Sequence, residues 1–176
     1  MNYSSELGMA CAVSSLQRSS FRYRVGKQPM PGEITIAPAR IIAADHQAEM
    51  RLHYQTILPA LGYKLLSGAE TGRQLIEHCH QHGPDLVIAD CKLPDMDVVD
   101  AAEEVCRSQR VPFIVTADHF DPQQLRRSGA DHFWAMLIKP ISRMHLEMVI
   151  PFVLFRFKKM QAFLEEVKSL RLQQVG

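Results

Sequence analysis

Short apolar runs that each end in a polar residue recur along the chain from residue 40 onward, and helix-length stretches separate them. An unbroken apolar run of about four residues is typical of a strand that is covered on both faces, as in a parallel sheet. Alternation of such strands with helices predicts an α/β fold with an open, doubly wound, five-stranded parallel sheet. The strands are expected at residues 41–44, 63–67, 86–89, 112–115 and 136–138.

Helices are expected between these runs, at residues 47–60, 70–82, 97–109 and 121–129. A last helix is expected from Val149 to Val175, either unbroken or broken near Pro151, because proline removes a hydrogen bond from the helical ladder. We expect three units along the chain: a flexible N-terminal extension (1–38), an α/β domain (39–150) and a coiled-coil-like C-terminal helix (151–176). The extension is rich in Ser, Gly and Pro and buries too little to order itself.

Composition narrows the choice of partners and compartment. The formal net charge of the 176 residues is +1, which gives no overall field toward nucleic acid or membranes. No apolar run reaches the ~18 residues that a membrane span needs. The four cysteines lack CxxC spacing and predict free thiols in a reducing compartment, so we expect a cytoplasmic protein.

Polar side chains mark the carboxyl ends of four expected strands: Asp45, Asp90, Thr116 and Lys139. In open α/β sheets the reactive groups gather at these ends. Two neighbouring carboxylates repel each other and therefore favour a divalent cation. An ammonium and a hydroxyl beside them can hold the oxygens of an anion. The set predicts a small site for phosphoryl transfer to a carboxylate.

The order and spacing of these motifs, over residues 39–150, resemble the receiver domain of two-component response regulators. The stretches that carry the resemblance are Ile42–Asp45, Pro84–Asp90 with Leu93–Asp97, Val115–Ala117, Gly129–Asp131 and Ile138–Pro140.

The resemblance implies a role for each strand-end residue. Asp90 is the phospho-acceptor, and Mg²⁺ is held by Asp45, Asp90 and the backbone carbonyl of Lys92. Thr116 is the switch hydroxyl, and Lys139 pairs with the phosphoryl group and precedes a cis proline. The implied partner is a histidine kinase or a phosphotransfer protein, and the chain is a signalling module rather than an enzyme with a free substrate.

The sequence departs from the family at several positions. His46 stands where receivers carry a second acid, which should weaken Mg²⁺ because that ion prefers oxygen ligands. His46 itself is either a ligand or pH-sensitive group, or a solvent-facing substitution. Val98 replaces a usual glycine. Extra residues before Lys139 leave Phe133 and Met136 as rival switch residues.

The C-terminal helix carries apolar residues at alternating steps of four and three, namely Val153, Phe157, Met160, Leu164 and Val167. This spacing is typical of a coiled-coil seam and predicts a homodimer. The alternative is that the stripe packs back on the domain. Residues 156–170 also resemble the linker helix of ANTAR-type antitermination regulators, which implies dimerisation. The family's basic RNA-binding motif is absent, so nucleic-acid binding is not expected.

Two further features have structural and functional interpretations. His78 and His82 have the spacing of zinc ligands on a helix but also suit solvated histidines at a helix end. Cys91 is expected to be a buried, unreactive thiol. Beside the phosphorylated signalling module, we keep a phosphate-independent interaction module and, less favoured, an RNA-binding regulator.

Overall fold

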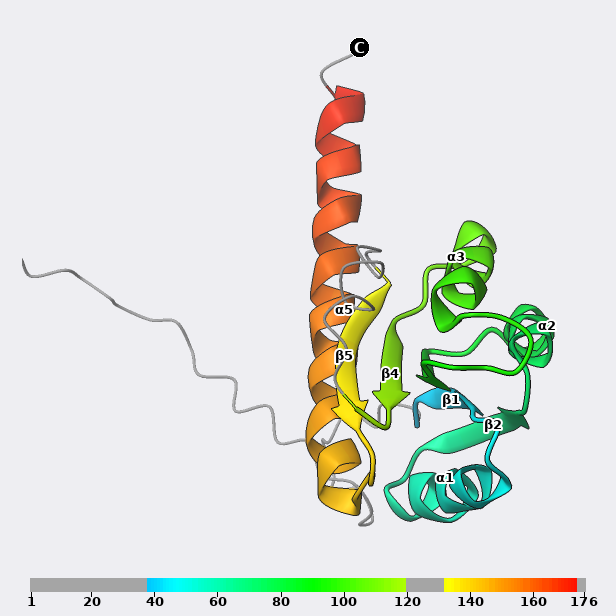
Figure 1. The fold of residues 1–176 in the computed structure, drawn as a ribbon. Coiled ribbons are helices and arrows are strands. Elements are labelled where there is room, and N and C mark those ends of the chain that lie inside the picture. The colour runs from blue at the N-terminus through cyan, green and yellow to red at the C-terminus, as the bar shows by residue number, and fades with distance from the viewer. Residues whose placement is uncertain (1–37, 120–131, 174–176) are drawn as a thin grey trace, which may run out of the picture.

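A computed structural model describes residues 38–119 and 132–173. Five parallel strands form one sheet in the order β2-β1-β3-β4-β5, which confirms the expected fold class (Figure 1). The strands are β1 (Arg40–Ala44), β2 (Lys64–Ala69), β3 (Leu86–Asp90), β4 (Phe113–Ala117) and β5 (Phe133–Ile138). The helices are α1 (Ala48–Ala60), α2 (Gly72–His82), α3 (Val98–Ser108) and α5 (Arg143–Gln173). The helix expected at 121–129 lies outside the described residues.

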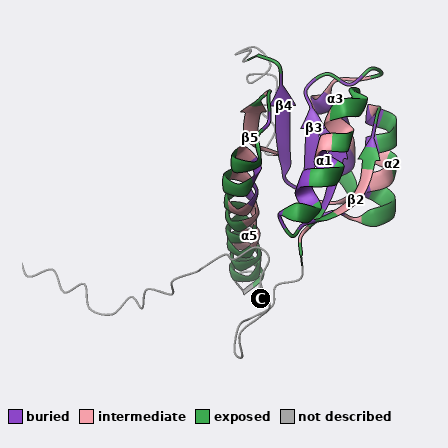
Figure 2. Ribbon diagram, turned by 90° about the horizontal axis from the view of Figure 1, so that it is seen from below, coloured by how far each residue is buried: buried purple, intermediate pink, exposed green. Residues whose placement is uncertain are grey.

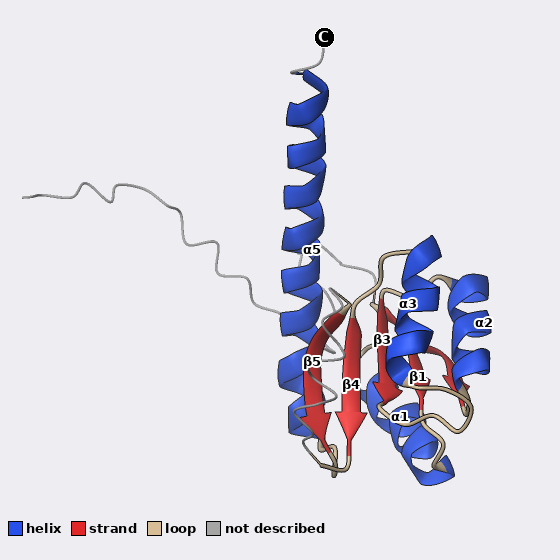
Figure 3. Ribbon diagram, turned by 45° about the horizontal axis from the view of Figure 1, so that its top comes forward, coloured by secondary structure: helices blue, strands red, loops and turns tan. Residues whose placement is uncertain are grey.

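Of the helices in the described residues, α1 and α5 cover one face of the sheet, and α2 and α3 cover the other (Figure 3). One buried cluster joins α1 and α5 to the sheet, and a second joins α2 and α3 to its other face. The central strands β3 and β4 are buried along their whole length (Figure 2), as their unbroken apolar runs predict. The strand order reverses between β1 and β3, and this reversal opens a site at the carboxyl ends of these strands.

The edge strands differ from their expected bounds. β2 runs on to Ala69, and β5 begins at Phe133 instead of 136. Both strands are largely half-buried, so their lengths follow backbone pairing with β1 and β4 rather than a fully buried apolar run. Trp134 therefore belongs to β5 itself.

The C-terminal helix α5 is a single helix that begins at Arg143, earlier than expected, and passes Pro151 without a break. At 1.5 Å per residue its 31 residues extend roughly 46 Å. Leu146, Ile150 and Val153 are fully buried against the sheet, whereas the later turns project beyond it (Figure 1). The boundary that we expected at residue 150 falls inside this helix.

Candidate functional site

A cluster of five side chains lies at the carboxyl ends of the strands, and we call it the strand-end cluster: Asp45, His46, Asp90, Thr116 and Lys139. Its four strand-end members were all expected from the sequence. Asp90 ends β3 and is the register partner of Thr116 in β4, so backbone pairing alone sets these two residues side by side. Asp45 and Lys139 directly follow β1 and β5.

Lys139 joins the two carboxylates of the cluster. Its Nζ lies 2.6 Å from Asp90 Oδ2 and 2.8 Å from Asp45 Oδ2, and the two carboxylates are almost wholly buried. Burial of the ammonium works to lower the pKa of Lys139. The hydrogen bonds and charges of Asp45 and Asp90 outweigh that effect, so the pKa of Lys139 is raised and the ammonium form is held. The Lys139–Pro140 bond is cis, as the resemblance implied.

His46 is directed at the same carboxylates. Its Nδ1 lies 3.4 Å from Asp90 Oδ2 and 3.8 Å from Asp45 Oδ1, while 42% of its side chain is exposed. The ring is thus open to solvent and part of the cluster at once. Asp45, His46 and Asp90 form a group that could hold a metal ion.

Backbone contacts fix the loops that carry the two acids. Asp45 Oδ1 accepts a hydrogen bond from the backbone N–H of Gln47 at 2.9 Å, and Asp90 Oδ1 accepts one from that of Lys92 at 3.1 Å. The Arg51 guanidinium donates to the carbonyls of Asp45 and His46 at 2.8 and 2.9 Å. Sequence analysis missed this role of Arg51, because the sequence does not indicate which group an arginine on a helix will contact.

A buried tyrosine lies beneath the cluster. The hydroxyls of Tyr54 and Thr116 are both buried, and neither makes a hydrogen bond of ordinary geometry in the described part of the chain. Burial raises the pKa of Tyr54 to about 12, while the nearby Thr116 hydroxyl works against that rise. The Thr116 hydroxyl therefore has only a loose contact with Tyr54, which it can exchange for a new partner. Sequence analysis missed Tyr54. The signal that could have indicated it is a hydroxyl-bearing residue on an apolar helix face.

The loop after β3 is tied to the starts of two helices. Asp95 Oδ1 and Oδ2 accept hydrogen bonds from the N–H groups of Gly72 and Arg73 at 2.7 and 3.0 Å, at the start of α2. Asp97 caps α3 through the N–H of Val99. Burial of Asp95 works to raise its pKa, but the hydrogen bonds from Gly72 and Arg73 prevail and lower it. A Cβ at Gly72 would collide with a side chain of this loop.

The structure separates the rival switch residues. Phe133 pairs with Phe113 at the amino end of β4, away from the cluster. Met136 pairs with Val115, the neighbour of Thr116, and so lies nearer to the cluster. Trp134 belongs to the other core cluster, and its ring packs edge-on against Phe157 at 5.4 Å.

The helix-end histidines do not make a second metal group. His78 Nδ1 forms a hydrogen bond with Ser67 Oγ at 2.7 Å, and the rings of His78 and His82 lie 6.2 Å apart. Within residues 38–119 and 132–173, the strand-end cluster supplies the one group of His, Cys, Asp and Glu side chains that could hold a metal. Cys91 is buried, as expected.

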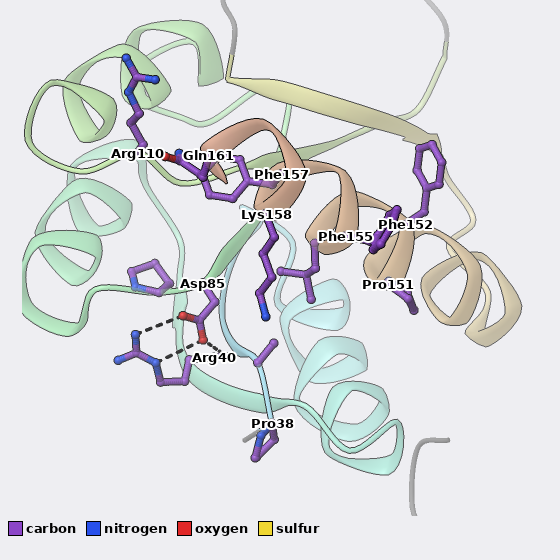
Figure 4. A pocket seen from close by; sticks show the side chains of 13 residues that line it. Pro38, Arg40, Asp85, Arg110, Pro151, Phe152, Phe155, Phe157, Lys158 and Gln161 are labelled. Carbon is purple, nitrogen blue, oxygen red and sulfur yellow. Dashed lines mark hydrogen bonds and ion pairs between the residues drawn. The ribbon is translucent and has the colours of Figure 1, made fainter. Parts of the chain in front are cut away.

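A pocket of about 900 Å³ lies at the opposite, amino end of the strands. Figure 4 shows Phe152, Phe155 and Phe157 of α5 on one side of it and the Arg40–Asp85 ion pair on another. No helix in the described ranges is long and apolar enough to cross a membrane.

Comparison with known proteins bears on the part of the chain that contains the strand-end cluster. Residues 41–150 match the model of the response regulator receiver domain. The "Transcriptional regulatory protein PdtaR" of Mycobacterium tuberculosis is 31% identical over 133 residues, which cover 76% of this chain and 65% of that protein. The "Chemotaxis protein CheY" of Bacillus subtilis is 38% identical over 66 residues, 38% of this chain and 55% of that one.

Solved structures agree on the fold. A CheY-like receiver domain protein from Methanospirillum hungatei superposes with a TM-score of 0.65 at 20% identity, over 70% of this chain and 98% of that one. CheY4 of Vibrio cholerae gives a TM-score of 0.62 at 22% identity, over 66% and 99% of the two chains.

Proposed function

Because the chain belongs to the response regulator receiver domain family of two-component signalling, we propose that it accepts a phosphoryl group on Asp90 and signals through its C-terminal helix. The observation that carries the proposal is the geometry of the strand-end cluster. It joins a carboxylate nucleophile, an ammonium paired with it at 2.6 Å and the buried hydroxyl of Thr116 at neighbouring strand ends. The donor is a histidine kinase, a phosphotransfer protein or a small acyl phosphate.

In the proposed transfer, an Asp90 oxygen attacks the phosphorus of the donor. The new oxygen–phosphorus bond forms as the bond from phosphorus to the donor's leaving group breaks. Lys139 stays beside the phosphoryl oxygens and balances their charge. Thr116 turns its hydroxyl from Tyr54 toward one of these oxygens. The product carries about two negative charges, where the free carboxylate carried one.

A divalent cation fits the same residues, because two buried carboxylates leave net negative charge beside a single ammonium. Asp45, Asp90 and the backbone carbonyl of Lys92 would hold Mg²⁺. When bound, the ion would neutralise charge on the transferring group. The replacement of a second acid by His46 should weaken it.

The first test is labelling by a small acyl phosphate, followed by intact mass, with and without Mg²⁺. The proposal expects a cation-dependent gain of one phosphoryl group that is absent from Asp90→Asn. Asp85→Asn is the matched control, because Asp85 lies at the opposite end of β3 and should label normally. Failure of the wild-type protein to label with any donor or divalent cation would contradict the proposal.

The output that we propose is homodimerisation through α5. The later turns carry apolar side chains on one face, where the sheet no longer covers them: Met160, Phe163, Leu164, Val167 and Leu170. The two earliest residues of the expected seam have another role, because Val153 is buried in the core and Phe157 packs on Trp134. The dimer seam therefore starts at Met160. Because kinases form the donor from ATP inside the cell, the proposal includes a cytoplasmic location.

A phosphate-independent interaction module is the second candidate. The observation that favours it is Lys139, which already links both carboxylates, together with His46 in place of an acid. In that case dimerisation would be the same in the wild-type protein and in Asp90→Asn, with or without a phosphodonor. A role in RNA binding is not part of the proposal.

A further inference from the structure

The position of His46 bears on which metal ion the strand-end cluster prefers. One ligand atom each from Asp45, His46 and Asp90 lie within 4.8 Å of one another. Two atoms bound to one ion at about 2.1 Å lie at most ~4.2 Å apart. The distances of 3.4 and 3.8 Å from His46 Nδ1 to the carboxylate oxygens fall inside that limit. The imidazole can therefore share an ion with both acids.

Arg51 fixes the backbone that carries this ring. One terminal nitrogen of its guanidinium donates to the carbonyls of Asp45 and His46, and the other lies 3.4 Å from a carboxylate oxygen of Glu70. The backbone that carries the ring is fixed, and the ring itself is open to solvent on one side. A ligand on a fixed backbone, with one side open to solvent, suits an ion that exchanges with solution.

Beneath the ring, one ammonium serves two carboxylates. Asp45 is fully buried, and Asp90 is nearly so. The balancing charge of Asp45 is the Lys139 ammonium at 2.8 Å, which is shared with Asp90. Two carboxylates against one ammonium leave a net charge of about −1 for a cation to neutralise.

The ligand chemistry distinguishes between cations. Mg²⁺ prefers oxygen ligands and holds its waters tightly. A nitrogen in place of a third oxygen therefore adds little to its affinity. First-row transition cations bind imidazole as well as carboxylate, with affinity that rises from Mn²⁺ onward. A set of two carboxylates and one imidazole is therefore better suited to these cations.

We infer that His46 is a metal ligand and that the cluster prefers a divalent transition cation of the Mn²⁺ type to Mg²⁺. The inference deepens the proposed function, because the same acids serve both, but it concerns binding alone. Its test needs no phosphoryl transfer.

The test is a titration of the full chain with Mn²⁺, followed by electron paramagnetic resonance at one fixed pH. Bound Mn²⁺ loses the signal of the free ion, and a directly bound imidazole adds a nitrogen hyperfine coupling. We expect binding with nitrogen coupling in the wild-type protein. His46→Ala should lose the coupling and bind Mn²⁺ at least ~10-fold more weakly. His80→Ala, on an exposed position of α2, should match the wild type.

Competition with Mg²⁺ completes the test. His46→Asp restores an acid pair, so its preference for Mn²⁺ over Mg²⁺ should fall at least ~10-fold from the wild-type value. This variant also covers the case in which His46→Ala does not fold. Absence of Mn²⁺ binding or of nitrogen coupling in the wild type would overturn the inference, as would equal preference in wild type and His46→Asp.

The two claims fail separately. Nitrogen coupling without any phosphoryl label on Asp90 would contradict the proposed function and leave the metal assignment standing. A label on Asp90 without nitrogen coupling would overturn the metal assignment alone.

Discussion

Lys139 carries the charge balance of the site at the residue scale. Its ammonium faces two buried carboxylates at 2.6 and 2.8 Å. Lys139→Met removes the cation and leaves both carboxylates uncompensated, so we expect a loss of about 3–5 kcal/mol in the free energy of unfolding. Urea denaturation measures this loss. Lys64→Met, at the exposed first residue of β2, is the control and should change the free energy of unfolding by close to zero.

The pH dependence of that loss follows from the direction of the pKa shift. The pKa of Lys139 is raised above its ordinary value of 10.5. Its contribution to stability is therefore complete below that value and disappears only as pH rises through the raised pKa. The loss in Lys139→Met should be the same at pH 7 and pH 9. A loss that shrank between these two values would show that Lys139 is not held as the ammonium.

Removal of the Tyr54 hydroxyl should not reduce stability in the way that removal of the Lys139 ammonium does. The buried hydroxyl of Tyr54 has only a loose contact with the Thr116 hydroxyl, so it contributes little to stability and costs desolvation. Tyr54→Phe should therefore unfold within about 1 kcal/mol of the wild type or be more stable. Tyr54→Ala, which empties the same fully buried position, should lose about 3–5 kcal/mol. Thermal and urea unfolding of both variants check this, and a larger loss in Tyr54→Phe would reveal a strong hydroxyl contact.

The sequence predicted those residues of the site that end buried apolar runs. Asp45, Asp90, Thr116 and Lys139 were identified because a parallel sheet brings strand ends to one edge, whatever the side-chain detail. The approach of His46 to Asp90 could not be predicted in this way. It depends on a loop conformation that Arg51 fixes from another element.

At the scale of elements, the start of α2 is held by side chains from outside the helix. Asp95 accepts hydrogen bonds from the first two N–H groups of this helix, and Thr71 caps the third at Gln74. Asp95→Ala should therefore cost about 1 kcal/mol at pH 7. Its pKa is lowered, so its contribution is present above the ordinary pKa and is lost as pH falls. The difference from wild type should shrink below about pH 4.

Urea unfolding at several pH values measures this difference. The control is Glu103→Ala on an exposed position of α3, which should change stability little at any pH. A cost for Asp95→Ala that stayed constant as the pH fell would contradict the role of the ionised carboxylate.

Helices and strands could be predicted where the apolar pattern and the residues at the ends of the element agree. The ends of α2 follow from Thr71 and from Gly83, whose φ of 55° favours glycine. The start of β5 and the start of α5 were missed. β5 is a half-buried edge strand, and the first residues of α5, Arg143 and Met144, are exposed. In such places apolar spacing does not distinguish a strand or a helix from the flanking loop. The seam on α5 was read from spacing alone, which does not say that Val153 belongs to the core.

In the whole molecule, the last turns of α5 extend beyond the receiver domain. Leu164→Asp places a charge on the apolar face of the uncovered turns, and we expect it to abolish dimers in sedimentation velocity. Ala162→Asp adds the same charge two residues away, on nearly the opposite face of the helix, and should leave dimers intact. Equal behaviour of the two variants would show that the dimer does not use this face.

Phosphorylation should move the dimer equilibrium, because new charge at Asp90 changes contacts of Thr116 and Lys139, and α5 packs on the adjacent strand β5. Sedimentation of labelled and unlabelled wild-type protein measures the shift. Identical sedimentation would favour the phosphate-independent module.

The central claim about this protein is that Asp90 carries the phosphoryl group. Borohydride reduces an acyl phosphate to an alcohol, so treatment of labelled protein converts a phosphorylated aspartate to homoserine, which peptide mass spectrometry locates. We predict homoserine at position 90 and at no other aspartate. Homoserine at Asp45 or elsewhere, with residue 90 unchanged, would contradict the assignment of Asp90 as the phospho-acceptor.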